Sequence, residues 1–240
     1  MFNVGKCANL RFQRGSSPCF DNLYTLGSEP IKYVPSHGDL GVTVDCQLKF
    51  HKHIEKVCAK VGGMASNFLK STVCRSSKFM LNVLTIHLRP VLEYGSPLWN
   101  TGYKGDLVLL EAVQRRWTKN IEGLESLPYH ARLSHLDLFS VQGRLWRTDM
   151  LLCWKIFHGA SRIRPEQLFV MAPDVGTRGH AFKILPPHLE SEARKRFFAT
   201  RVISDWNGLP NRVVQATFVE SFKRLFALTC QYKLFQYHGD

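Results

Sequence analysis

The sequence has 240 residues, of which 45% are hydrophobic and 21% are charged. These values are ordinary for globular proteins and exclude wholesale disorder, and the length suits one large domain or two small ones. No apolar run approaches the roughly 18–20 residues of a membrane span, and the N-terminus lacks the apolar region of a signal peptide. We therefore expect an intracellular protein, nuclear or cytoplasmic, that is neither secreted nor membrane-bound.

Basic residues exceed acidic ones throughout the chain. Lys and Arg number 32 and Asp and Glu 19, which gives a formal net charge of +13. Both halves carry the excess, with 16 basic and 8 acidic residues before residue 121 and 16 and 11 after it. A spread of this kind is either a solvated surface or a footprint for a polyanion, and the pI near 9.6 favours nucleic acid as the partner.

The seven cysteines are widely spaced, and no two form a Cys-x-x-Cys pair. An odd, scattered set argues against a disulfide framework. His51 and His53 lie near Cys46 and Cys58 but lack the paired spacing of a zinc site. Reduced, mostly buried thiols are the better interpretation.

The first 46 residues have the pattern of short strands and turns. We predict one strand at residues 23–26, before Gly27, and another at 42–46, where Val42, Val44 and Cys46 alternate with polar residues. Together they predict a small antiparallel patch.

From about residue 51 the apolar period becomes helical. The apolar positions are Ile54, Val57, Cys58, Val61, Ala65 and Phe68, and the opposite face carries Lys49, Lys52, Lys56 and Lys60. Eight Lys or Arg between residues 48 and 92 are balanced only by Glu55, so lysines at i,i+4 spacing repel one another. The stripe is either a solvated face or a surface that a phosphate backbone would neutralise. Gly62 and Gly63 each cost about 1 kcal/mol in a helix and predict a kink or a close backbone approach.

Two further helices are expected before residue 122. One covers residues 76–88 and ends before Pro90. The other begins at Asp106 as N-cap and ends near residue 121. Its apolar side comprises Leu110, Val113, Trp117 and Ile121, and its basic side comprises Arg115, Arg116 and Lys119.

The second half predicts three more helices and a long loop. One helix covers residues 141–158 and ends at Gly159. Another covers 191–206, and the last begins at Thr217 with a capping box to Glu220. Their inward positions are Phe198, Val202 and Trp206 in the first and Phe218, Phe222 and Leu225 in the second. The Pro- and Gly-containing residues 159–190 read as a loop.

Taken together, the pattern predicts an α+β fold that is predominantly α-helical, with a small antiparallel β patch at the N-terminus. We divide it into residues 1–48, a helical region 49–122 and a helical region 123–240. We interpret the tryptophans at helical spacing as core residues rather than residues that stack on bases. They are Trp99, Trp117, Trp146, Trp154 and Trp206.

The motifs of a self-sufficient active site are missing from these 240 residues. We find no Gly-rich phosphate loop, no Gly-x-Ser-x-Gly elbow and no His-Glu-x-x-His motif. Two adjacent aspartates do not occur either. Asp39 and Asp45 could share a metal, but aspartates beside turns usually cap the backbone. We therefore predict no catalytic and no metal-binding residue.

Several strings in a fixed order resemble one family. They are residues 3–7 (NVGKC), 39–45 (DLGVTVD), 48–50 (LKF) with His53, 88–99 (LRPVLEYGSPLW), 110–119 (LEAVQRRWTK), 129–133 (YHARL), 178–180 (RGH), 197–202 (FFATRV) and 206–210 (WNGLP). The set resembles the C-terminal part of the reverse transcriptases of jockey-type non-LTR retrotransposons, which are long interspersed elements. The resemblance covers nearly the whole chain.

The resemblance implies a role for each region. Residues 1–48 correspond to a palm remnant in which Lys6 matches a palm lysine left vestigial, and Leu40 and Gly41 match the hairpin that grips the primer. Residues 49–122 correspond to the thumb, and residues 123–240 to a C-terminal extension. The nucleic-acid-binding residues would be Leu40, Gly41, Lys49, Lys52, Lys56, Lys60, Arg115, Arg116 and Lys119. The partners would be RNA and DNA as a primer–template duplex, with no small-molecule substrate.

The family's catalytic aspartates, which hold Mg²⁺ in the full-length enzyme, lie upstream of the NVGKC string. We therefore expect a truncated fragment that binds primer–template, holds no cofactor and does not polymerise alone. The alternative is a fragment of an intact RNA-directed DNA polymerase whose N-terminal part was lost in gene prediction. A third possibility, a decayed insertion without a stable product, fits poorly with the intact helical stripes.

Overall fold

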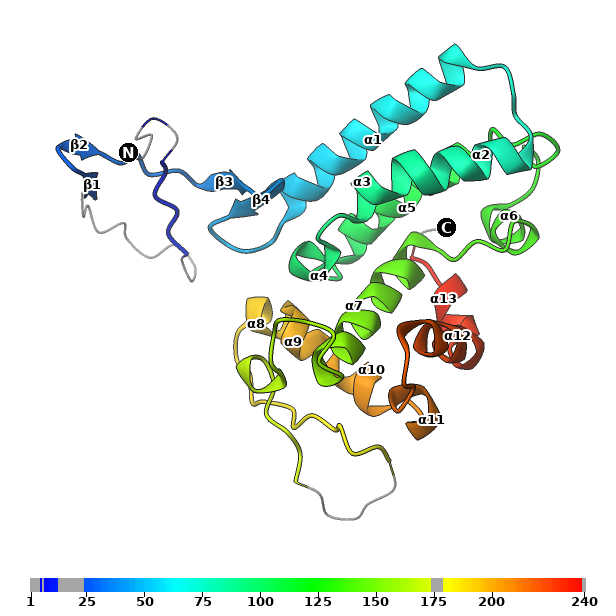
Figure 1. Cartoon of the computed structure of the whole chain (residues 1–240). Coiled ribbons are helices and arrows are strands. Elements are labelled where there is room, and N and C mark those ends of the chain that lie inside the picture. Colours follow the sequence, from blue (N-terminus) through cyan, green and yellow to red (C-terminus); the bar gives the residue numbers. More distant parts are fainter. Residues whose placement is uncertain (1–4, 6, 13–23, 174–178, 239–240) are drawn as a thin grey trace.

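The computed structural model describes residues 5, 7–12, 24–173 and 179–238. Two small two-stranded antiparallel sheets precede a series of helices (Figure 1), so the predicted α+β, predominantly helical fold is confirmed. None of the helices in the described ranges combines the length and the apolar character that crossing a bilayer requires.

The sheets are both hairpins. The first pairs β1 (Thr25–Leu26) with β2 (Glu29–Pro30), and the second pairs β3 (Ser36–Asp39) with β4 (Val42–Asp45). In the second hairpin Ser36 lies opposite Asp45 and Asp39 opposite Val42. The strands predicted at residues 23–26 and 42–46 therefore appear as β1 and β4, with residue 23 outside the described part. Asp39 and Asp45 lie at opposite ends of the hairpin rather than side by side.

Helices α1 to α6 form the larger body next to the second hairpin (Figure 1). They are α1 (His51–Ser71), α2 (Ser77–Val83), the π-helix η2 (Leu84–Leu88), α3 (Arg89–Glu93), α4 (Ser96–Trp99), α5 (Lys104–Thr118) and α6 (Tyr129–His135). Helix α1 packs against α5 and α3. The buried residues of this body form one apolar cluster that extends from Val42 to Leu145.

Three local expectations for this body are wrong. The helix does not end before Pro90: α2 continues through the π-helix η2 into α3, whose second residue is Pro90. Gly62 and Gly63 lie in an unbroken helix, and a Cβ at either would meet no atom within 4 Å. Asp106 is not the N-cap of α5; it is buried in the first turn and contacts His51 of α1.

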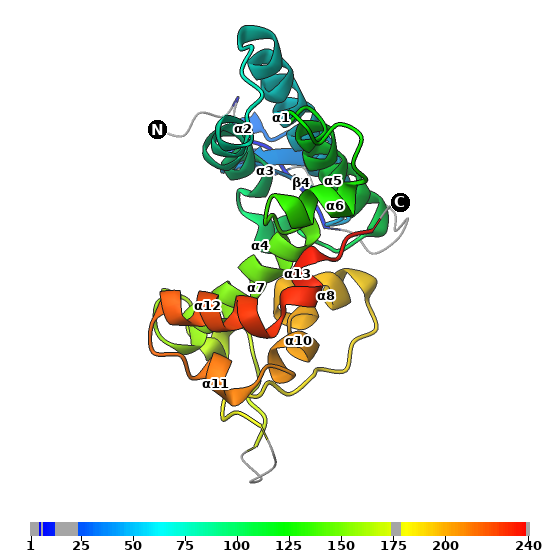
Figure 2. The same ribbon diagram turned by 90° about the vertical axis from the view of Figure 1, so that its right-hand side faces the viewer.

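Helices α7 to α13 form the second body (Figure 2). They are α7 (Val141–Phe157), the 3₁₀ turn η3 (Pro165–Gln167), α8 (Glu192–Arg196), α9 (Phe198–Arg201), α10 (Ile203–Asn207), α11 (Asn211–Val214), α12 (Val219–Thr229) and α13 (Gln231–Phe235). A second apolar cluster holds it together, from Met150 to Leu234. Helix α7 contributes to both clusters and so connects the two bodies, as both views show (Figures 1 and 2).

The helix expected at 191–206 is three short helices. Phe197 is extended (φ −64°, ψ 147°) and separates α8 from α9, and Val202 lies between α9 and α10. The expected inward residues Phe198, Val202 and Trp206 are nevertheless buried. The capping box at Thr217 is not formed, since α12 begins at Val219 without a side-chain cap. Phe218 is accordingly exposed rather than inward-facing.

The expected helix over residues 141–158 is confirmed by α7, and Gly159 follows it with φ 67°. Of the five tryptophans, Trp99, Trp117, Trp154 and Trp206 are buried and Trp146 is half-buried. Their interpretation as core residues is therefore confirmed for the buried four.

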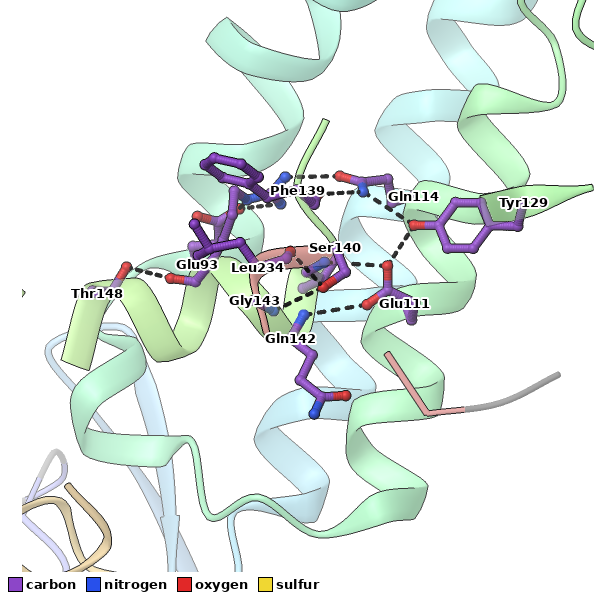
Figure 3. A network of polar contacts seen from close by, with 12 residues as sticks. Glu93, Glu111, Gln114, Tyr129, Phe139, Ser140, Gln142, Gly143, Thr148 and Leu234 are labelled. Atoms are coloured by element: carbon purple, nitrogen blue, oxygen red, sulfur yellow. Dashed lines mark hydrogen bonds and ion pairs between the residues drawn. The ribbon is translucent and has the colours of Figure 1, made fainter. Parts of the chain in front are cut away.

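A buried polar network joins α5, α6 and α7 (Figure 3). The carboxylate of Glu111 accepts hydrogen bonds from the Tyr129 hydroxyl and from the backbone N–H groups of Val141 (3.1 Å) and Gln142 (3.2 Å). It thus satisfies the donors at the start of α7, where a negative group is favourable. The Ser140 hydroxyl donates to the backbone carbonyl of Gln236 at 2.5 Å, which fastens the end of the described chain to the same network.

Candidate nucleic-acid interface

The β3–β4 hairpin turns through Leu40 and Gly41, which have φ values of 45° and 84°. Positive φ at both positions defines a type I′ turn, which matches the twist of a hairpin but suits Asn or Gly far better than Leu. The left-handed conformation costs a bulky residue on the order of 1–2 kcal/mol. Leu40 is nevertheless 84% exposed, so burial of its side chain does not offset this cost. The tip of the hairpin therefore presents an apolar side chain to solvent.

Asp45 joins this hairpin to helix α1. Its carboxylate accepts hydrogen bonds from the backbone N–H groups of Gln47 (2.9 Å), Lys49 (3.2 Å) and Phe50 (2.7 Å). A second link runs from the Thr43 N–H to Nδ1 of His53 at 3.2 Å. These bonds fix the hairpin beside the first turns of α1, which explains how two segments that are adjacent in the sequence form one surface.

The basic face predicted for α1 is present. Lys52, Lys56 and Lys60 are exposed, as is Lys49 just before the helix. Within the described part of the chain no carboxylate pairs with Lys52, Lys56 or Lys60. The acid of this helix, Glu55, instead contacts His51 at 3.2 Å. The mutual repulsion of the three lysines is therefore not compensated by any carboxylate of the described residues.

His51 also connects α1 with α5. Its Nδ1 lies 2.5 Å from a carboxylate oxygen of the buried Asp106. This hydrogen bond raises the pKa of His51, with smaller contributions from the charges of Asp106 and Glu55 and opposition from desolvation. The bond stabilises the position of the basic face relative to α5.

The hairpin and the basic face meet at a hollow of about 390 Å³. It is lined by Gly41, Thr43, His53, Lys56, Val57, Lys60, Pro90, Val91 and Tyr94. The Lys56 ammonium donates a hydrogen bond to the Thr43 hydroxyl at 3.3 Å, across the rim between helix and strand. Three of the predicted binding residues, Gly41, Lys56 and Lys60, are thus brought together. Leu40 lies at the adjacent turn.

The basic residues of α5 divide between two environments. Arg116 and Lys119 are exposed and line a groove of about 750 Å³ between α1 and α5, on the side of α1 away from the hairpin. Gly62 lies in the same groove. Arg115 does not join them: it is half-buried, with its guanidinium 5.2 Å from the ring centre of Tyr129 and 5.6 Å from that of Tyr237. Its prediction as a member of the outer basic face is wrong.

Lys6 lies outside the described residues. The structure adds Thr43, His53 and Tyr94 to the predicted site. His53 is buried, and burial together with the charge of Lys56 lowers its pKa, so the ring is neutral at pH 7. Each of these three residues belongs to the strings that carry the family resemblance. The sequence spacing, however, does not indicate that residue 94 lies next to residue 41.

Comparisons with known proteins provide little information on function. No protein-family model matches the sequence, and no solved structure matches it. The chain is 25% identical over 107 residues to an uncharacterized protein of Caenorhabditis elegans. That match covers 43% of this chain and 54% of the nematode protein. The chain thus spans about half the length of the relative it matches.

Proposed function

We propose that this chain is a fragment related to non-LTR retrotransposon reverse transcriptases that binds a primer–template duplex of RNA and DNA. Its basic helix α1 and the tip of the β3–β4 hairpin form the binding surface. The 240 residues contain no pair of adjacent aspartates, so the proposed role of this chain alone is binding and not polymerisation. The alternative, a piece of an intact RNA-directed DNA polymerase, assigns the same surface to a larger enzyme.

One observation carries the proposal: Gly41 of the hairpin turn lines the same hollow as Lys56 and Lys60, which pair with no carboxylate among the described residues. Lysines contact phosphates, and such contacts position a nucleic acid without reading its sequence. The exposed Leu40 and Tyr94 beside them add apolar and aromatic surface, a combination typical of proteins that hold nucleic acid strands. We expect recognition by backbone and shape, as in A-form helices.

Fluorescence anisotropy with a labelled RNA–DNA hybrid, carrying a recessed DNA primer, tests this proposal. We expect saturable binding that weakens as salt increases. The double substitution Lys56→Glu and Lys60→Glu should lower the affinity strongly. The matched control is Lys195→Glu with Lys223→Glu, which changes the net charge equally but on α8 and α12. Equal losses in the two variants would show that total charge, and not this surface, determines binding.

A nucleotide-incorporation assay with the same hybrid tests the expectation that this chain alone binds the hybrid without polymerising. The chain should add no nucleotide in the presence of magnesium or manganese. Incorporation by purified material would show that polymerisation does not require the adjacent aspartates that these residues lack.

A further inference from the structure

Tyr94 is an exposed aromatic residue on a fixed backbone. It lies between α3 and α4 and is 59% exposed. Its carbonyl accepts a hydrogen bond of 2.6 Å from the indole N–H of Trp99, which is itself 1% exposed. Gly95 follows with φ 66° and makes the turn that positions Tyr94. The structure therefore holds the backbone of Tyr94 firmly and leaves its ring open to solvent.

The ring lies next to the hairpin turn. A Cβ added at Gly41 would lie 3.5 Å from Cε1 of Tyr94, in van der Waals contact. The same hollow has apolar walls from Pro90 and Val91 and ammonium groups from Lys56 and Lys60. Its volume, about 390 Å³, is within the range of roughly 300–1,000 Å³ found for small-molecule sites.

His53 lines the hollow and has a hydrogen-bond donor without a partner in the described part of the chain. Because its Nδ1 accepts the Thr43 N–H, its proton is on Nε2. Nε2 is buried and has no hydrogen-bond partner among the described residues. A buried donor without a partner costs free energy, so this wall of the hollow is not optimised for the stability of the chain alone.

We propose that the hollow binds one unpaired nucleobase, stacked on the ring of Tyr94, with the adjoining phosphates on Lys56 and Lys60. This inference rests on the proposed function and specifies the part of the nucleic acid that the hollow accepts. An aromatic face stacks on any base, while the lysines follow the backbone, so the site tolerates every sequence. A paired base does not suit it, because only an unpaired base can leave the stack and enter the hollow.

A hybrid duplex with a single-stranded overhang tests this inference. The overhang carries 2-aminopurine, a base whose fluorescence decreases when it stacks, at its first unpaired position. Binding of the full chain should quench the probe, and Tyr94→Phe should quench it equally because the ring is kept. Tyr94→Ala should abolish the quenching and weaken binding by about 5- to 150-fold. Tyr232→Ala, at an 81% exposed tyrosine on α13, is the matched control and should behave like the unaltered chain.

The outcomes separate the two proposals. If the unaltered chain does not bind the probe, the proposed function is wrong. If it binds but Tyr94→Ala leaves the quenching unchanged, the base-stacking site is wrong while the binding surface remains. Quenching that is equally strong with 2-aminopurine inside the duplex would also overturn the assignment to an unpaired base. Circular dichroism of Tyr94→Ala identifies any loss that comes from misfolding.

Discussion

Replacing Lys52, Lys56 and Lys60 together by alanine should make duplex binding much less sensitive to salt. The three ammonium groups lie at i,i+4 intervals, about 6 Å apart along the helix axis, and no carboxylate of the described chain pairs with them. Each contact with a phosphate contributes about 0.7–0.9 to the slope of log K against log salt. The slope should therefore decrease by about 2–3. Between 50 and 200 mM salt, the unaltered chain should lose about 20- to 40-fold more affinity than the variant.

The assay is fluorescence anisotropy of the labelled hybrid at several salt concentrations. A control with equal charge change replaces Lys195, Arg212 and Lys223 by alanine on α8, α11 and α12. Its slope should stay close to that of the unaltered chain. The reasoning is refuted if the α1 variant keeps its slope, or if the control loses as much.

Stability should change in the opposite direction to binding. Removing lysines that repel one another should stabilise α1 by a few tenths of a kcal/mol per pair. The variant should thus unfold at an equal or higher urea concentration than the unaltered chain. Weak binding together with unimpaired stability would exclude unfolding as the cause.

Three further predictions concern stability. Gly62→Ala should stabilise the chain by about 0.4–1 kcal/mol, because a Cβ there meets no atom and alanine favours the helix. Tyr129→Phe should destabilise it by about 1–3 kcal/mol, because Glu111 loses a buried donor. The bond to Asp106 raises the pKa of His51. It therefore stabilises the fold fully below about pH 6.5, and this contribution is lost as the pH rises through the folded-state pKa. Asp106→Asn should remove that dependence. Urea unfolding measures all three.

Each of these three stability predictions has its own control. Alanine at Gly143 should destabilise the chain, since its Cβ would overlap the backbone of Leu234; equal effects at Gly62 and Gly143 would contradict the packing argument. Tyr232→Phe removes a hydroxyl from an exposed ring and should change little. For His51, the stability difference between the unaltered chain and Asp106→Asn should shrink from pH 6 to pH 9, and a constant difference would contradict the assignment.

The long helices could be predicted from sequence because their apolar period is decided locally. Helices α1, α5 and α7 all follow the 3.6-residue pattern. The errors occur where tertiary contacts override local preference. Asp106 has the chemistry of an N-cap but bonds to His51 of another helix. Pro90 is accommodated by a π-helix, whose occurrence the sequence pattern does not indicate.

In the candidate site, too, the sequence predicts the features that depend on local pattern and misses those that depend on tertiary contacts. The lysines of α1 and the hairpin turn at Gly41 follow from periodicity and from ordered strings. Helical angle alone predicts Arg115 on the outer face, but the rings of Tyr129 in α6 and of Tyr237 cover its guanidinium. Tyr94 enters the site because the segment after α3 folds back onto the hairpin, and no periodicity connects those segments.

The backbone of the proposed binding surface is fixed by contacts within the chain. Asp45 ties the hairpin to α1 through three backbone hydrogen bonds, and α1 rests on α5 through packing and the His51–Asp106 bond. Binding as proposed would then order only side chains, at about 0.5–1.5 kcal/mol each, rather than whole segments. A duplex along the lysines would have the hairpin tip on one flank and Arg116 with Lys119 on the other. Because β4 of the hairpin and α5 both pack against α1, an alteration that tilts α1 should weaken the contacts on both sides together.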